Sequence, residues 1–382
     1  MSSVTEHSAA ATLRKTALNA MHRRLGAKMV DFGGWDMPVE YSGLIAEHMA
    51  VRTGVGVFDV SHMGDILVMG KQALAAVQHI SMNDAARLQV GQAHYSALLY
   101  PQGTFVDDVI VHKLSENDYL LVINAGTREK DWDWVRQNVS RFNCHAKDFS
   151  DYYTQLAIQG PRAVDVVQKL TGIALSPLKN YWFQYGTFCG IPNTMVARTG
   201  YTGEDGFEVY VPSDVATSER VWNEVLEAGR DFGIVPCGLG ARNTLRLESK
   251  MALYGHEISG TINVFEAGLD RYAKFDKGDF IGRAALEKVR SEGLSRVLVG
   301  LEMIERGIGR DGYPVLDDSG RRIGEITSGS PAPFLRKNIA LAYVPPQFSA
   351  LETVVNVEVR GQKVKAKVVP TPFYKRPRKS AS

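Results

Sequence analysis

The chain has 382 residues, with 44 Lys and Arg against 42 Asp and Glu. This near-neutral balance gives no electrostatic reason to expect nucleic acid or a membrane surface as a partner, and no apolar run is long enough to span a bilayer. The three cysteines are widely separated and lack histidines at metal-ligand spacing, which argues against a disulfide framework or a zinc site and favours a reducing, cytoplasmic compartment.

The first part of the chain predicts an irregular mixture of helices and strands, which favours an α+β fold over a doubly wound parallel sheet. We interpret the residues before Leu13 as a short disordered extension. The patterns then predict, in order, a helix at 13–25, a glycine-broken extended segment at 28–39, a helix at 43–52, a strand at 57–69, a helix at 71–80, strands at 93–100, 104–112 and 118–124, and a helix at 127–140.

The later part continues this mixture and then changes character. We expect helices at 161–170, 214–232 and 241–248, with a hairpin at 194–211 between the first two. After Ser291 the chain consists of short strand-like runs separated by glycines, which predicts an all-β C-terminal domain. The basic segment at 375–379 is interpreted as a solvated tail.

The hairpin tip at 200–208 contains three glycines and three carboxylates. Glu208 lies in the second strand, so its carboxylate has a fixed direction and can accept two parallel hydrogen bonds from a planar donor edge, such as arginine or an amino-pyrimidine ring. The glycines would let the backbone approach a flat ligand closely. The alternative is an ordinary solvated turn, which many glycine-rich hairpins with acidic tips are.

Two further clusters carry candidate chemistry. Asp107 and Asp108 are adjacent in an apolar strand and must point to opposite faces, so that one can be structural while the other enters a pocket. Arg242 and Arg246 lie one helical turn apart after a glycine-rich segment. They could bind a carboxylate or an electron-rich ring, or they could pair with a nearby acid as plain structure.

An ordered set of motifs covering nearly the whole chain from Leu13 onward resembles the aminomethyltransferase family, the T protein of the glycine cleavage system. The motifs are Phe32-Gly33-Gly34-Trp35, Val57-Phe58-Asp59-Val60-Ser61-His62-Met63, Val106-Asp107-Asp108-Val109-Ile110-Val111, Ile123-Asn124-Ala125-Gly126, Leu156-Ala157-Ile158-Gln159-Gly160-Pro161, the 200–208 hairpin, Gly238-Leu239-Gly240-Ala241-Arg242 and Pro370-Thr371-Pro372-Phe373-Tyr374-Lys375. Tyr272 departs from the tryptophan that family members often carry near this position, and 261–265 lacks an expected proline.

The resemblance implies a three-domain cloverleaf around a central channel that holds tetrahydrofolate. The first domain would comprise 1–62 and 148–285, the second 63–147, and the C-terminal β domain 286–382. Such an enzyme receives an aminomethyl group on the dihydrolipoyl arm of the H protein, releases ammonia and passes the methylene group to tetrahydrofolate, without a metal.

The resemblance also assigns roles to residues that match the family's motifs. Asp108 would be the key acid, near the reactive nitrogen of the folate, while Asp107 faces the other side of the strand. Glu208 would bind the amino-pyrimidine edge of the pterin. The remaining residues predicted to contact or enclose the folate are Met63, Tyr95, Asn124, Tyr201, Arg242, Phe373, Tyr374 and Arg376.

Three alternatives to this function remain. The first is a related folate-dependent demethylase or the folate domain of a sarcosine or dimethylglycine dehydrogenase, which would need a flavin-binding domain that the chain lacks the length and fingerprint for. The second is a non-catalytic folate-binding protein that assists iron-sulfur maturation, whose Lys-Gly-Cys-Tyr motif does not occur here. The third is a small-molecule binding module without turnover.

Overall fold

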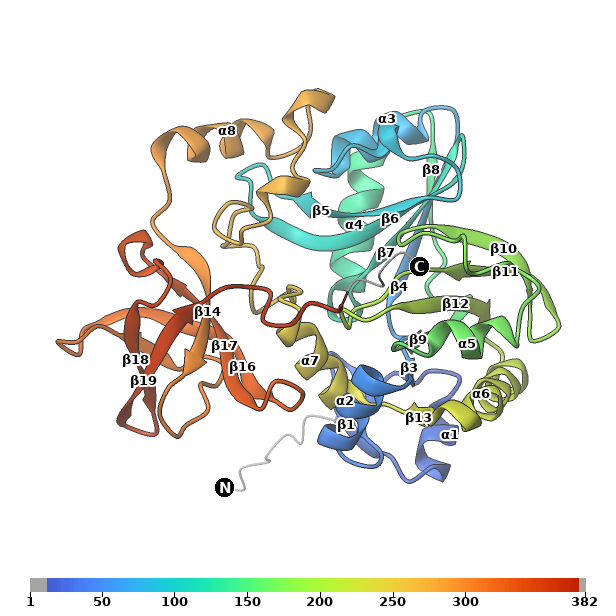
Figure 1. The fold of residues 1–382 in the computed structure, drawn as a ribbon. Coiled ribbons are helices and arrows are strands. Elements are labelled where there is room, and N and C mark those ends of the chain that lie inside the picture. Colours follow the sequence, from blue (N-terminus) through green and yellow to red (C-terminus); the bar gives the residue numbers. More distant parts are fainter. Residues whose placement is uncertain (1–11, 378–382) are drawn as a thin grey trace, which may run out of the picture.

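The computed structural model describes residues 12–377. Its strands form a six-stranded sheet, a five-stranded sheet, a closed six-stranded barrel and a two-stranded ribbon, with helices interspersed. Figure 1 shows three lobes: the barrel on the left, the five-stranded sheet above the centre and the six-stranded sheet on the right. The predicted α+β class and the all-β C-terminal domain are confirmed. The extension before Leu13 and the end of the basic tail lie outside the described residues.

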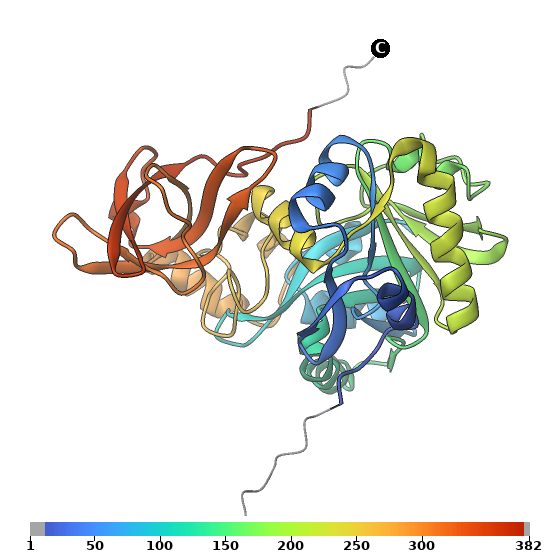
Figure 2. The ribbon, with the colours of Figure 1, turned by 90° about the horizontal axis from the view of Figure 1, so that it is seen from below.

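The six-stranded sheet is antiparallel except where β13 joins it in parallel. Its strands, in spatial order, are β10 (Phe183–Phe188), β11 (Ile191–Ala197), β12 (Gly206–Pro212), β9 (Tyr153–Gln159), β3 (Gly56–Asp59) and β13 (Val235–Pro236). The accompanying helices are α1 (Asn19–Arg24), α5 (Ala163–Gln168) and α6 (Val215–Gly229). Figure 2 shows α6 lying along the outside of this sheet. Its Trp222 is fully buried in a core shared with Phe207 of β12.

The five-stranded sheet is wholly antiparallel. Its strands, in spatial order, are β5 (Ala93–Leu99), β6 (Phe105–Ser115), β7 (Asp118–Ile123), β4 (Gly64–Met69) and β8 (His145–Asp148). Helices α3 (Ala73–Ile80) and α4 (Arg128–Val139) pack on it through buried aliphatic residues that include Val77 and Val135. The alternation of buried side chains along β6 therefore fixes which of its residues face away from these helices.

The prediction of a single strand at 57–69 is wrong, because the chain changes sheets within this segment. The backbone N–H of Ser61 donates to the Asp59 carboxylate at 2.9 Å, and the N–H of Met63 donates to the carbonyl of Val60 at 3.0 Å. This turn separates β3 of one sheet from β4 of the other. Met63 consequently lies at the crossing between the two sheets.

The first predicted helix begins later than expected. Instead of starting a helix, Arg14 exchanges backbone hydrogen bonds of 2.8 Å with Gly34 and Asp36 in the ribbon formed by β1 (Lys28–Phe32) and β2 (Trp35–Glu40). At the other end of the core, α8 (Arg283–Glu292) is a helix that the sequence analysis does not predict. It spans the predicted boundary at 285/286, and the domain boundaries remain predictions.

The barrel closes through pairing of its first strand with its last. Its strands, in spatial order, are β14 (Val297–Met303), β17 (Lys337–Val344), β16 (Arg322–Ala332), β15 (Pro314–Leu316), β18 (Val354–Val359) and β19 (Gln362–Val369). Closure leaves no long unpaired edge, and the interior is filled by aliphatic side chains. Among the described residues, no helix is long and apolar enough to cross a membrane.

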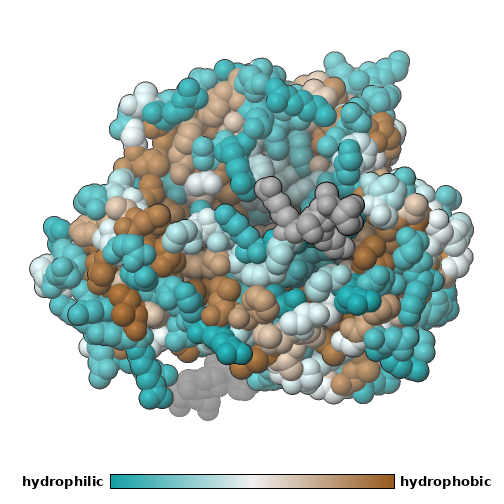
Figure 3. All heavy atoms as spheres, in the orientation of Figure 1, coloured by the Kyte–Doolittle hydropathy of each residue, from teal (hydrophilic) through white to brown (hydrophobic). Residues whose placement is uncertain are grey.

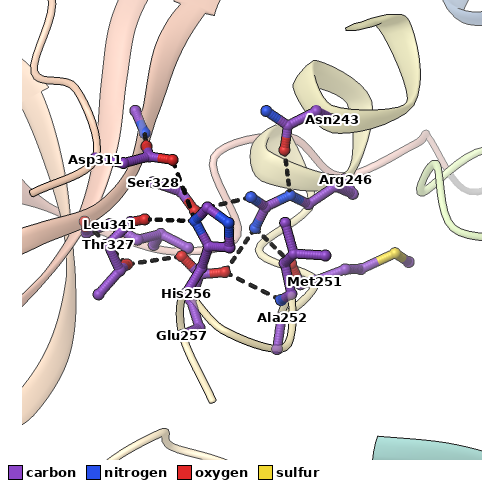
Figure 4. A network of polar contacts seen from close by, with 12 residues as sticks. Asn243, Arg246, Met251, Ala252, His256, Glu257, Asp311, Thr327, Ser328 and Leu341 are labelled. Carbon is purple, nitrogen blue, oxygen red and sulfur yellow. Dashed lines mark hydrogen bonds and ion pairs between the residues drawn. The ribbon is translucent and has the colours of Figure 1, made fainter. Parts of the chain in front are cut away.

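A buried ionic network joins the barrel to the core (Figure 4). Arg246 of α7 (Leu239–Glu248) donates to Glu257 at 2.6 Å and to the hydroxyl of Ser328 in β16 at 2.8 Å. Glu257 also accepts a 2.6 Å hydrogen bond from Thr327. The Arg246 and Glu257 side chains are 1% and 0% exposed, so the pair is shielded from water. Of the two roles that the sequence allows for Arg246, ligand binding and pairing with an acid, the structure shows pairing with Glu257.

Gly238 allows α7 to pack closely against the N-terminal ribbon. A Cβ added at this glycine would lie 2.3 Å from the carbonyl carbon and oxygen of Val39. Because these are backbone atoms, relieving the clash requires the ribbon or α7 to shift. We expect Gly238→Ala to destabilise the protein by about 1–3 kcal/mol, the usual cost of overpacking, and to displace α7. Thermal unfolding measures the loss. Gly172→Ala is the control, since nothing lies within 4 Å of its added Cβ; equal losses in the two variants would contradict the packing argument.

Candidate active site

A cavity of about 240 Å³ lies between the two sheets, the start of α7 and the segment 249–272. Seven predicted site residues line it together: Met63, Tyr95, Asp108, Asn124, Tyr201, Glu208 and Arg242. They come from both large sheets and from α7, so residues far apart in the sequence converge on one space. Figure 3 shows hydrophilic side chains spread over one face of the molecule, which is hollowed near its centre.

Asp108 is held on the cavity wall by two donors. The Tyr95 hydroxyl donates to one carboxylate oxygen at 3.0 Å and the Asn124 side-chain amide donates to the other at 2.7 Å. Burial and the neighbouring charge of Asp107 raise the pKa of Asp108 to about 7, although both hydrogen bonds act in the opposite direction. Burial and the Asp108 charge also raise the pKa of Tyr95 well above its usual range, so Tyr95 remains a neutral donor.

Asp107 does not line the cavity, as the alternation of strand side chains predicts. Its fully buried carboxylate accepts hydrogen bonds from the backbone and the side chain of Asn124, at 3.1 and 2.9 Å, and from the hydroxyl of Thr127 at 2.8 Å. The two adjacent acids therefore have different surroundings. Asp108 is open to the cavity and Asp107 is enclosed by protein donors.

Glu208 lies in β12 opposite Ala197, and its carboxylate faces the cavity. Burial raises its pKa, while a hydrogen bond from the Thr199 hydroxyl and the charge of Arg242 oppose the rise. Thr199 lies two residues after the end of β11 and is not among the predicted site residues. The hairpin geometry that carried the prediction for Glu208 also points to this residue, because Ala197 pairs with Glu208 and the chain just after Ala197 therefore lies beside it.

The other two acids of the hairpin tip are occupied by ion pairs. Glu204 accepts a hydrogen bond of 3.0 Å from Arg52, and Asp205 accepts two hydrogen bonds from Arg198. The glycines are crowded by the protein itself: a Cβ at Gly200 would lie 2.0 Å from the side chain of Gln159. Close packing against Gln159 is therefore enough to require glycine at position 200, without the predicted role of admitting a flat ligand.

Arg242 presents an unpaired cation to the cavity. Its guanidinium lies 4.7 Å from the ring centroid of Tyr201, and within residues 12–377 it forms no ion pair with a carboxylate. Burial lowers its pKa, and the charge of Glu208 counters this effect. A cation that is buried without a fixed partner is available to an anionic or electron-rich ligand.

The segment 249–272 supplies lining residues that the sequence analysis does not predict as site residues. The ring of Tyr272 lies 4.8 Å from that of Tyr95, and the two rings form an aromatic wall beside Asp108. Lys250 and Arg271 also line the cavity. Tyr272 stands at the position where the sequence departs from the family pattern, so this departure falls inside the site.

The predicted C-terminal residues lie apart from this cavity. Tyr374 packs over the guanidinium of Arg52, 3.9 Å from its ring centroid, and Phe373 packs in a cluster with Leu247. Arg376 lines an adjoining cavity of about 200 Å³ and forms a 3.3 Å ion pair with Asp205. Phe373 and Tyr374 pack on the core and do not line this cavity, which differs from the prediction that they help to enclose it. Within the described part of the chain, no group of three His, Cys, Asp or Glu side chains is arranged to hold a metal ion.

Comparison with known proteins matches the chain along nearly its full length. The model of the GCVT N-terminal domain matches residues 18–277, and that of the glycine cleavage T-protein C-terminal barrel domain matches residues 296–375. An aminomethyltransferase of Acidobacterium capsulatum is 72% identical over 98% of this chain and 99% of that protein. One of Koribacter versatilis is 66% identical over 97% and 98%.

A solved structure agrees with these sequence matches. The glycine cleavage system aminomethyltransferase T of Bartonella henselae superposes with a TM-score of 0.89 and 32% sequence identity, covering 95% of this chain and 98% of that one. The agreement extends from the two large sheets through the C-terminal barrel. The chain therefore belongs to the aminomethyltransferase family of glycine cleavage T proteins.

Proposed function

We propose that the chain is the aminomethyltransferase of a glycine cleavage system, and that the cavity between the two large sheets is its tetrahydrofolate site. The aminomethyl group would arrive on the dihydrolipoyl arm of a lipoylated H protein. Ammonia leaves and the methylene group passes to tetrahydrofolate, which is a substrate. The observation that carries the proposal is the convergence of Asp108, Glu208 and Arg242 on one cavity in a chain of this family.

The polar groups of the cavity suit a pterin held by its edge. Glu208 offers a carboxylate whose direction is fixed by β12, which suits two parallel hydrogen bonds from an amino-pyrimidine edge. Arg242 supplies positive charge close by, and Tyr95 and Tyr272 supply an aromatic surface. Binding would thus combine a directional contact with ring packing. Arg376, which lines the adjoining cavity together with Thr199 and Gly200, would then act at the entrance.

Asp108 would act on charge that develops during transfer. Methylene transfer releases an amine and generates positive charge on carbon and nitrogen, and an ionised carboxylate beside these atoms stabilises that charge. Because the pKa of Asp108 is raised to about 7, the side chain can hold or release a proton close to neutral pH. Asn124 and Tyr95 keep the carboxylate directed into the cavity without neutralising it.

Glu208→Gln tests the proposed pterin contact. Glutamine keeps the shape of the side chain but replaces one acceptor oxygen with a donor, which would oppose the pterin amino edge. We expect the dissociation constant for tetrahydrofolate to rise about 10- to 100-fold, the value of a charge-assisted hydrogen bond. Equilibrium binding measures it. The control is Glu116→Gln, because the Glu116 side chain is 78% exposed. An unchanged dissociation constant in Glu208→Gln would show that Glu208 does not contact the pterin.

One assay tests the reaction itself. The purified chain is mixed with tetrahydrofolate and aminomethyl-loaded H protein, and ammonia and methylene-tetrahydrofolate are measured. We expect both products in equal amounts and none from sarcosine or dimethylglycine, the substrates of the demethylase alternatives. No release above the uncatalysed rate from a folded chain would contradict the proposal. Folate binding alone would leave the function as that of a binding protein.

A further inference from the structure

Behind the cavity wall, the carboxylate of Asp107 shares a donor with Asp108. The β6–β7 register pairs Ile110 with Val122, which places Asn124 opposite Asp108 two residues further along. The side-chain nitrogen of Asn124 lies 2.9 Å from Asp107 and 2.7 Å from Asp108. An amide NH₂ group has two hydrogens, so each acid receives one of them. A single side chain therefore bridges two acids on opposite faces of one strand.

Asp107 fixes the orientation of this bridge. Besides the side-chain bond, it accepts a hydrogen bond from the backbone N–H of Asn124 at 3.1 Å, and the hydroxyl of Thr127 donates to it at 2.8 Å. These donors satisfy the hydrogen-bonding capacity of a fully buried carboxylate. If the Asn124 amide rotated, its hydrogen bonds to Asp107 and to Asp108 would both break. By holding this amide in one orientation, Asp107 therefore also holds the carboxylate of Asp108.

A third acid lies behind Asp107 on α4. Asp131 is fully buried, and within the described residues neither of its oxygens has a hydrogen-bond partner. Burial and the charge of Asp107 raise the pKa of Asp131 to about 10, so Asp131 is protonated at pH 7. Lys130, 3.5 Å from Asp131, is partly exposed and directs its ammonium toward the carbonyl of Val106 and the ring of Tyr254.

We infer that Asp107 is a positioning residue for Asp108: through the shared side-chain amide of Asn124 it holds the reactive carboxylate in place. The charge of Asp107 is also one cause of the raised pKa of Asp108. The inference rests on the role proposed above for Asp108. The ionisable groups that face the two acids fall into two sets. Those on the same side of the cavity or behind it are Tyr95, Lys130, Asp131, Tyr181, Tyr201 and Tyr272, and those that line the rest of the cavity are Glu208, Arg242, Lys250 and Arg271. Burial raises the pKa values of Tyr95, Tyr181 and Tyr201, and Asp107 is the neighbouring carboxylate that raises the pKa of Asp108.

The test is the dependence of kcat on pH in matched variants. Asp107→Asn removes the charge, so the pKa of Asp108 falls and the rising limb of the profile moves to lower pH by about one unit or more. Losing an anchoring hydrogen bond also lowers kcat about tenfold. Asp107→Glu keeps the charge and should keep the midpoint near the wild-type value. Asp131→Asn changes neither charge nor shape at pH 7 and should leave the midpoint in place.

Thr127→Val gives a second measurement should Asp107→Asn fail to fold. It removes one donor to Asp107 and keeps the charge, so kcat should fall several-fold while the KM for tetrahydrofolate stays constant. A folded Asp107→Asn enzyme with the wild-type midpoint would overturn the inference, as would an unchanged kcat in Thr127→Val. Asp108→Asn is measured alongside: if it is fully active, the role of Asp108 itself fails, which is a different result from an unshifted midpoint in Asp107→Asn.

Discussion

Asp108→Asn is expected to lower kcat for methylene transfer about 10²- to 10⁴-fold, with little change in the dissociation constant for tetrahydrofolate. Asparagine keeps the shape of the side chain and the contacts with Tyr95 and Asn124 at reduced strength, but it carries no charge. The wild-type rate should rise with pH around a midpoint near 7, where Asp108 ionises, and the variant should lack this limb. Steady-state kinetics at roughly pH 5.5 to 9 measure the fall in kcat and the loss of the rising limb.

The same variant should be more stable than the wild type at high pH. The pKa of Asp108 is raised from 3.8 to about 7 by folding, so above pH 7 the folded state bears the cost of a buried charge that the unfolded chain does not. Asp108→Asn removes this cost, which amounts to up to about 4 kcal/mol. Below pH 3.8 both states are protonated, and the gain should vanish. Chemical denaturation at pH 8 and pH 3.5 tests the sign.

The control for both effects is Asp133→Asn, which removes a carboxylate that is 70% exposed on α4. It should alter neither kcat nor the pH dependence of stability. An Asp108→Asn enzyme with wild-type kcat would show that the cavity binds its ligand without needing this acid. Equal kcat loss in both variants would place the effect in the overall charge of the protein.

Arg246→Ala is expected to destabilise the protein by about 3–5 kcal/mol, because it leaves Glu257 buried without its partner. The carboxylate would keep its hydrogen bond from Thr327 but lose the only cation that it pairs with among the described residues. Since Arg246 also donates to Ser328 of β16, the barrel should loosen from the core before the core unfolds. Hydrogen exchange resolved along the chain measures this order.

The double variant Arg246→Met with Glu257→Met separates charge burial from packing. Both charges are removed together and the space is filled by apolar side chains, so the loss should be much smaller than in either single variant. Urea denaturation of all four proteins completes the cycle. If the double variant lost as much stability as the sum of the single ones, the pair would contribute no coupling, and the account of this junction would be wrong.

The sequence predicted the parts of the site that follow from local pattern. Glu208 was placed in a strand by alternation in the hairpin, and the opposite orientations of Asp107 and Asp108 followed from the two-residue repeat of a strand. The all-β character of the C-terminal domain followed from short strands between glycines, and the structure confirms it; the closure of these strands into a barrel is a finding of the structure. These features depend on neighbouring residues only, so a single sequence contains them.

The parts that were missed depend on contacts between distant segments. The 57–69 run has strand character throughout, and it divides between two sheets at a turn closed by the hydrogen bonds of Ser61 to Asp59 and of Met63 to Val60. Tyr272 reaches the cavity from a segment with little regular structure, which no periodicity marks. The bridge from Asp107 through Asn124 to Asp108 needs the β6–β7 register, and local patterns do not give register.

The most direct test of the central claim is a crystal structure of the chain with tetrahydrofolate bound. We expect the pterin to lie in the cavity between the two large sheets, with its amino-pyrimidine edge on Glu208 and its reactive nitrogens beside Asp108. Tetrahydrofolate bound elsewhere, such as in the surface groove lined by Val90 and Tyr185, with the cavity empty, would contradict this expectation.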